Sequence, residues 1–228
     1  MKKSILCAIC IGLFGLVMVF SGCTQTTLDY AERNISEVRH NIFEGATADY
    51  FVTFSSGQRE QPYIIDGKSE TKTNFGIISV LPRGALNPVS LEFSMTINAK
   101  FYTGQFERSP FDDTFAFDIG VTASDADDIS VTIKRNADEQ SADLSCISQA
   151  FSVKSDKALE IAVSEFETEL KTLTDDGNIS AEVYIKIISD ADKTIGQYFW
   201  FVSFINSELA ELSAIIDPMS GEVIAKKL

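Results

Sequence analysis

The sequence contains little histidine, tryptophan and cysteine. Its 228 residues include one histidine, His40, one tryptophan and four cysteines. A single histidine does not by itself build a zinc site, which takes three or four protein ligands. Three of the cysteines, Cys7, Cys10 and Cys23, lie within the first 23 residues, so Cys146 stands alone in the rest of the chain. We therefore predict no structural disulfide there, no metal site and no cofactor.

Positive charge is also scarce. Lys and Arg together number 19 against 33 Asp and Glu, and the formal net charge is −14. Such a chain is repelled by phosphate backbones, so nucleic acid is excluded as a partner. Hydrophobic residues make up 45% of the sequence and include 17 phenylalanines. Most of the chain therefore has enough apolar surface to form a packed core, and disorder across it is not expected.

The beginning of the chain has the pattern of an export signal. Lys2 and Lys3 precede an apolar stretch over residues 5–20, and Ser21, Gly22 and Cys23 follow. A charged start, an apolar run and small residues at its end are typical of a secretory signal peptide. The apolar run is shorter than the roughly 20 residues that cross a bilayer. Simple secretion and an uncleaved membrane anchor remain the alternatives.

The four residues Phe20-Ser21-Gly22-Cys23 resemble the lipobox of bacterial lipoproteins, although that family prefers Leu where Phe20 stands. The resemblance implies cleavage between Gly22 and Cys23, which removes residues 1–22. It also implies that Cys23 carries diacylglycerol and anchors the protein on the extracytoplasmic face of the cell membrane. Two or more acyl chains hold a protein stably on a membrane, because each buried CH₂ contributes about 0.8 kcal/mol.

Residues 23–48 are predicted to be a lipidated tether that leads into an amphipathic helix. Apolar residues recur there at spacings of three and four and end near Gly45, the pattern of one buried helical face. The positions are Leu28, Ala31, Ile35, Val38 and Ile42. His40 lies in the same segment.

Residues 49–151 show a period of two, which predicts strands. The clearest is residues 89–101, where apolar and polar side chains alternate without interruption. Shorter apolar runs at 50–54, 63–65, 75–81, 114–121, 129–133 and 142–147 are separated by turn residues such as Ser56-Gly57 and Asp66-Gly67. Short strands at this spacing predict an antiparallel β-sandwich, with an immunoglobulin-like arrangement as one form of it.

Residues 152–228 predict a small α+β domain with one helix on an antiparallel sheet. Ser155 has the chemistry of an N-cap, and apolar residues from Leu159 to Leu173 then mark one helical face. Strands are expected at 179–188, 197–205, 209–216 and 222–225. The whole chain is therefore assigned to the α+β class.

This tail resembles the PepSY domain family of exported bacterial proteins. The residues that carry the resemblance are KALEIAV at 157–163, YFWFVSF at 198–204 and IIDPMSGEVI at 215–224. The family has no universal catalytic residue and is associated with envelope regulation and with pro-segments of exported proteases. No protease follows in this sequence, which weakens the case for a directly inhibitory role.

Several acidic residues and one cysteine are candidates for metal binding or catalysis. Asp125, Asp127 and Asp128 offer oxygen atoms of the kind calcium binds, but the spacing of an EF-hand is missing. Cys146 needs a neighbouring base to act as a nucleophile. The remaining candidates are the pairs Asp112 with Asp113 and Asp190 with Asp192, and the aromatic run 198–204, which suits either a central strand or a binding groove.

No catalytic residue is assigned from these patterns. The sequence predicts an envelope lipoprotein with a non-catalytic binding or regulatory role, whose partners are the membrane and another envelope protein. The alternatives are an envelope enzyme with a carboxylate-based site and a structural spacer. Convergent carboxylates in a pocket favour the enzyme, and an exposed apolar surface favours binding.

Overall fold

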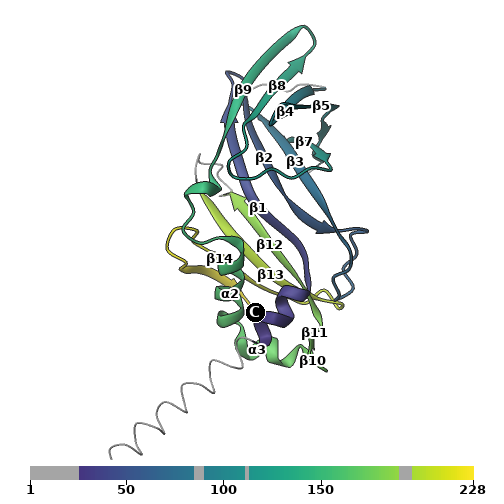
Figure 1. Cartoon of the computed structure of the whole chain (residues 1–228), viewed down its shortest axis with the longest axis vertical. Helices are drawn as coiled ribbons and strands as arrows, with labels where there is room; N and C mark the ends of the chain where they lie inside the picture. The colour runs from purple at the N-terminus through teal and green to yellow at the C-terminus, as the bar shows by residue number, and fades with distance from the viewer. Residues whose placement is uncertain (1–25, 85–89, 111–112, 190–196) are drawn as a thin grey trace, which may run out of the picture.

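The computed structural model describes residues 26–84, 90–110, 113–189 and 197–228. Within these ranges the chain is mostly antiparallel β-sheet with few helices, in agreement with the predicted class at that level (Figure 1). The predicted signal peptide, Gly22 and Cys23 lie outside the described residues, as do Asp112, Asp190 and Asp192. None of the helices in the described ranges is long and apolar enough to cross a membrane.

A long sheet runs through the whole molecule, and β1 (Ile35–Ala46) lies in its middle. β1 pairs in parallel with β12 (Ala181–Ser189) and antiparallel with β2 (Tyr50–Glu60). Beyond β2 come β3 (Lys72–Pro82), β7 (Phe115–Ile119) and β6 (Glu107–Arg108). Beyond β12 come β13 (Tyr198–Asn206), β14 (Glu211–Ile216) and β15 (Val223–Lys227).

A second group of strands branches from β1. β9 (Asp138–Cys146) pairs with β1 at Phe43 and Glu44, and with β8 (Ile129–Arg135) along its length. β8 pairs with β4 (Glu92–Ile97), which pairs with β5 (Lys100–Gln105). These strands occupy the end of the molecule opposite the helices in Figure 1.

The helix predicted up to Gly45 is wrong beyond its first turns. Residues 26–33 are helical and bury Leu28 and Ala31, but the chain then becomes β1. Six β1 positions, 36–38 and 41–43, are buried, and they include polar Ser36, Glu37 and Asn41. Burial on both faces removes the two-residue alternation that identifies a strand, so the apolar residues alone suggested a helix.

Two of the predicted features in residues 50–65 are also wrong. Ser56 and Gly57 do not turn the chain but lie inside β2. A Cβ atom on Gly57 would lie 1.8 Å from the Val38 carbonyl oxygen, so glycine is required there because β1 approaches closely. Residues 63–65 form no strand, and the side chains of Tyr63 and Ile64 are 51% and 53% exposed.

The single strand predicted over residues 89–101 is a hairpin. β4 ends at Ile97, and Asn98 and Ala99 have positive φ angles of 48° and 65° before β5 begins at Lys100. Two consecutive residues of this kind make the tight turn that suits antiparallel strands. The turn changes which alternate residues face inward, so Phe101 is 69% exposed while Leu91, Phe93 and Met95 are buried.

The elements predicted in the last third are observed within a few residues. α2 (Ser155–Glu165) and α3 (Glu167–Thr172) are separated at Phe166, and the short pair β10 (Thr174–Asp175) and β11 (Asn178–Ile179) follows. Lys154 rather than Ser155 occupies the N-cap position of α2, and no side chain caps it. A short 3₁₀ helix, η1 (Ser148–Ala150), precedes α2.

The described residues form two hydrophobic cores, which β1 connects. One contains buried side chains of residues 26–33, α2, α3 and β12 to β14, with Trp200 and Phe204 among the largest. The other contains side chains of β2, β3 and β7 together with β4, β8 and β9. Val38 and Ile42 belong to the first core and Phe43 to the second. Strands from before and after residue 152 belong to one continuous sheet. The division of the chain into two domains at residue 152 stays a prediction.

Candidate functional site

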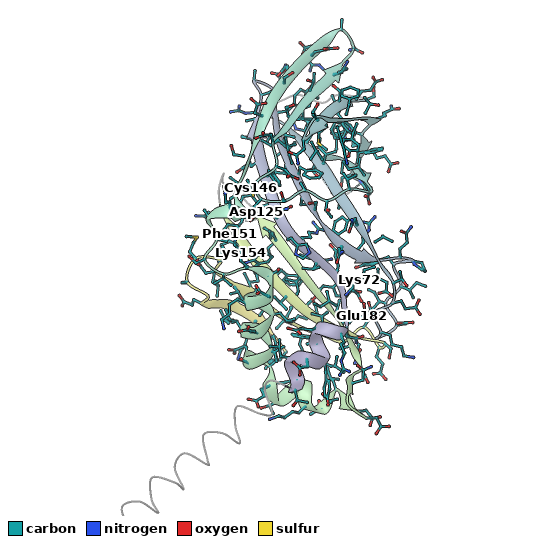
Figure 2. The ribbon with its side chains drawn as sticks, viewed as in Figure 1. Lys72, Asp125, Cys146, Phe151, Lys154 and Glu182 are labelled. Atoms are coloured by element: carbon teal, nitrogen blue, oxygen red, sulfur yellow. The ribbon has the colours of Figure 1, made fainter. Side chains whose placement is uncertain are left out.

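The structure brings together candidate residues that are far apart in the sequence, at the junction of the two cores. Cys146 ends β9, Asp125 lies in the loop between β7 and β8, and Lys154 immediately precedes α2. Figure 2 shows these three side chains close to one another and to Phe151. His40 lies on β1, near enough to the Asp125 carboxylate for its negative charge to affect the pKa of the imidazole.

The distances within this junction cluster define a small polar network. The Cys146 thiol lies 3.5 Å from Asp125 Oδ1 and 3.4 Å from Ser148 Oγ. Lys154 Nζ lies 3.4 Å from Asp125 Oδ2 and donates a 2.8 Å hydrogen bond to the Ser148 carbonyl oxygen. The backbone N–H of Ile42 donates to Ser148 Oγ at 3.1 Å, which attaches the network to β1.

The loop that carries Asp125 is held by buried polar residues of β1 and β2. The side-chain amide of Asn41 donates to the Ala123 carbonyl oxygen, and Ser56 Oγ donates to Asn41 Oδ1 at 2.9 Å. Ser56 Oγ also accepts from the Ala123 N–H at 2.9 Å. These bonds explain why polar residues are buried in β1, since buried polar groups need partners.

The electrostatics of the cluster keep the thiol protonated. Partial burial raises the pKa of Cys146, and the nearby Asp125 carboxylate raises it further, although the Ser148 hydroxyl acts in the opposite direction. Desolvation lowers the pKa of His40 while Asp125 opposes that change. The thiolate is the nucleophilic form of cysteine, so this arrangement disfavours nucleophilic catalysis by Cys146.

This electrostatic argument predicts slow alkylation of Cys146. At pH 8, Asp125→Asn should increase the rate of reaction with iodoacetamide several-fold, because each unit by which the thiol pKa falls gives up to ten times more thiolate. Mass spectrometry of the modified protein measures the rate, and Asp143→Asn, an exposed change on the same strand β9, is the control. An unchanged rate in Asp125→Asn would show that the carboxylate does not control the thiol.

Two of the other acidic candidates, Asp127 and Asp113, form hydrogen bonds or an ion pair with residues close to them in the sequence. Asp127 accepts from the Ser124 N–H at 2.9 Å and from the Ser124 hydroxyl at 2.7 Å, which closes its own turn. Asp113 forms an ion pair with Arg108 at 3.0 Å. In the described ranges, no group of three or more His, Cys, Asp or Glu side chains is placed to hold a metal ion.

A second cluster, which the sequence analysis missed, surrounds Glu182 on β12. Glu182 is fully buried, and its Oε1 accepts hydrogen bonds from the backbone N–H groups of Asp66 at 2.6 Å and Gly67 at 2.9 Å. The hydroxyl of Tyr184 donates to its other oxygen. The carboxylate therefore fastens the loop between β2 and β3 to the sheet.

Neighbouring residues complete this loop-anchoring cluster. The side-chain amide of Asn34 donates to the Gly67 and Ile179 carbonyl oxygens at 3.1 and 2.9 Å, and its Oδ1 accepts from the Ser69 N–H at 2.9 Å. Burial raises the pKa of Tyr184, and the hydrogen bond to Glu182 adds to that effect. Glu182 and Tyr184 are both buried, so we interpret this cluster as structural. The feature of the sequence that could have indicated it is an acidic residue, Glu182, within the apolar stretch AEVYIKII.

The aromatic run over residues 198–204 forms β13, which lies between β12 and β14. Tyr198, Trp200, Val202 and Phe204 point into the core that contains α2 and α3. Phe199 and Phe201 are half-buried and belong to neither core. Ser203, on the same side of the strand as Phe199 and Phe201, is buried, so the run forms a central strand of the sheet.

The comparisons with known proteins do not extend these observations. No protein-family model, no curated protein and no solved structure matches the chain.

Proposed function

We propose that the protein is a lipoprotein of the bacterial cell envelope, anchored through Cys23, with a non-catalytic binding or regulatory role. The anchor rests on the export signal and on the four residues that end at Cys23. The observation that carries the non-catalytic part is the position of Cys146, the one cysteine beyond that signal, whose thiol lies 3.5 Å from the Asp125 carboxylate. Its raised pKa and its contact with a carboxylate that is already paired to Lys154 suit a structural thiol.

The position of the helix at residues 26–33 supports an orientation on the membrane. The helix at residues 26–33 begins three residues after Cys23, and Arg33 donates a 3.0 Å hydrogen bond to the Gly177 carbonyl oxygen between β10 and β11. This end of the molecule lies opposite the β8–β9 hairpin (Figure 1). A lipid on Cys23 would hold the helical end near the membrane and direct the β4, β5, β8 and β9 strands away from it.

The finer description of the fold belongs to the same proposal. We interpret residues 49–151 as an antiparallel sandwich, which is supported by one core that contains side chains of both groups of strands. We interpret residues 152–228 as a PepSY-like α+β domain. It is supported by α2, whose side chains Leu159 and Val163 share a core with Trp200 and Phe204 of the sheet. In this arrangement β1 and residues 26–33 complete the sheet and core of the tail.

The proposed anchor is tested by changing Cys23. Cys23→Ala should abolish incorporation of a labelled fatty acid and leave an unprocessed precursor in the membrane, because the family's processing requires the lipidated cysteine. Metabolic labelling and the mass of the N-terminal peptide measure both effects, and Cys146→Ala is the matched control. Normal labelling and cleavage in Cys23→Ala would exclude the lipoprotein assignment.

A further inference from the structure

A groove at the helical end of the molecule brings leucine side chains together at the surface. Its volume is about 570 Å³, and it lies between α3, the turn that joins β13 to β14, and the last residues of the chain. The leucines that line it are Leu173, Leu209, Leu212 and Leu228. Leu209 and Leu228 are 66% and 70% exposed, and apolar surface gathered in one place marks an interaction site. We refer to these four residues as the leucine groove.

The turn between β13 and β14 holds Leu209 in a backbone conformation that leucine rarely adopts. Its φ angle is 63°, in the left-handed region, where a bulky side chain is strained. Asn206 fixes the turn, since its carbonyl oxygen accepts from the Leu209 N–H at 2.9 Å. Its side-chain Oδ1 accepts from the N–H groups of Glu208 at 3.0 Å and Ala210 at 2.9 Å. Strain of this kind is found most often at functional sites, and here it presents a leucine to the surroundings.

The leucine groove lies at the same end of the sheet as the start of the described chain. β13 ends at Asn206 beside Ala181, the first residue of β12, and two residues further on β12 pairs with Ile35 at the start of β1. The helix at residues 26–33 comes directly before β1 and shares one hydrophobic core with α3. Figure 1 shows this helix, α3 and the C-terminus together at the helical end.

The short connection between the proposed anchor and this helix brings the groove close to the bilayer. Three residue spacings separate Cys23 from Thr26, and an extended chain covers at most about 3.6 Å per residue, or roughly 11 Å in all. A lipidated Cys23 therefore holds the helical end against the membrane surface. The leucine groove lies at that end, so the membrane is the partner that the length of the connection presents to it.

The chemistry of the groove suits lipid hydrocarbon better than charged head groups. Apolar side chains of proteins that lie on a membrane enter the boundary between head groups and acyl chains to a depth of about 5–10 Å. Lys227, the basic residue that lines the groove, is paired with Glu211 at 2.7 Å, and Glu169 also lines it. Such a site does not attract anionic lipid, which binds to clusters of Lys and Arg. The leucines are therefore what the groove offers to a membrane.

We propose that Leu209 and Leu228 contact the acyl chains of the membrane that carries the anchor, so that the leucine groove is the surface by which the protein lies on that membrane. This inference rests on the lipid anchor proposed above and adds a second contact to it. Two contacts hold the protein in one orientation, with the β8–β9 hairpin directed away from the bilayer. The lipid on Cys23 alone would leave the protein to rotate about its connection.

Fluorescence quenching by labelled lipid tests this contact. The full-length lipidated protein is placed in neutral phosphatidylcholine vesicles in which part of the lipid carries a doxyl quencher near the start of an acyl chain. Trp200 is fully buried, so it contributes the same background to every variant. Leu209→Trp should lose several-fold more emission to the quencher than Phe101→Trp, which adds an exposed tryptophan at the opposite end of the molecule.

Leu228→Trp is the second reporter, because it changes the end of the chain and leaves the strained turn unaltered. It should be quenched as strongly as Leu209→Trp, with the circular dichroism spectrum of each variant unchanged. Flotation of the vesicles shows separately whether the protein is anchored. Anchored protein in which positions 209 and 228 are quenched no more than position 101 would overturn the role of the leucine groove and leave the anchor in place. Protein that does not float with the vesicles would overturn the anchor, and this inference with it.

Discussion

Replacing Glu182 by Ala is expected to lower the free energy of unfolding by about 4 kcal/mol. The carboxylate is fully buried and accepts from the N–H groups of Asp66 and Gly67 and from the Tyr184 hydroxyl. Its removal leaves these donors enclosed without an acceptor. A buried donor without a partner costs about 1–3 kcal/mol, and breaking a buried charged network costs about 3–5 kcal/mol.

Urea unfolding measures this effect directly. The chain has a single tryptophan, Trp200, whose burial in the adjacent core makes its fluorescence a reporter of unfolding. Glu182→Gln keeps one acceptor and a similar shape, so it should lose less stability than Glu182→Ala. Glu208→Ala is the control, since Glu208 is exposed in the turn between β13 and β14. Equal stabilities of Glu182→Ala and Glu208→Ala would contradict the anchoring role of the carboxylate.

The last third of the chain could be predicted well from the sequence because each element there buries one clear face. Leu159, Ala162 and Val163 recur at helical spacing and are buried in α2. The strands predicted at 209–216 and 222–225 leave a short connection after β14, and Asp217 Oδ1 accepts from the N–H groups of Met219 and Ser220 within it. Local patterns of this kind depend on neighbours in the sequence, so they are visible without the tertiary structure.

The middle of the sheet could not be predicted in the same way. β1 is surrounded by β2, β12 and β9, and its burial includes Ser36, Glu37 and Asn41. The partners of these polar residues come from segments far along the chain, such as Ala123 for Asn41. Their burial therefore follows from the topology, and no local signal distinguishes them from surface residues.

The junction cluster was only partly accessible from the sequence. The sequence indicates that Cys146 stands alone among the cysteines beyond residue 23, but it does not connect Asp125 and Lys154 with it, and both lie close to it in the structure. The approach of these residues depends on β9 returning to β1 and on η1 turning the chain toward α2. Without that geometry, the influence of Asp125 on the thiol pKa could not be inferred.

Trp200→Ala is expected to lower the free energy of unfolding by about 3–5 kcal/mol, the usual cost of removing a large buried aromatic side chain. Trp200 is fully buried, its ring meets that of Phe151 edge-on at 6.1 Å, and its Nε1–H donates to the Val153 carbonyl oxygen at 2.8 Å. The side chain thus joins β13 to the segment between the junction cluster and α2. Its removal creates a cavity and frees that segment.

Circular dichroism during urea unfolding measures this loss, because the substitution removes the fluorescent reporter. Trp200→Phe keeps most of the apolar volume and loses the hydrogen bond, so it separates the two contributions and should cost less than Trp200→Ala. Phe101→Ala removes an aromatic ring that is 69% exposed and should change stability by about 0.5 kcal/mol or less. If Trp200→Ala were no more destabilising than Phe101→Ala, β13 would not be the central strand of the helix-covered core.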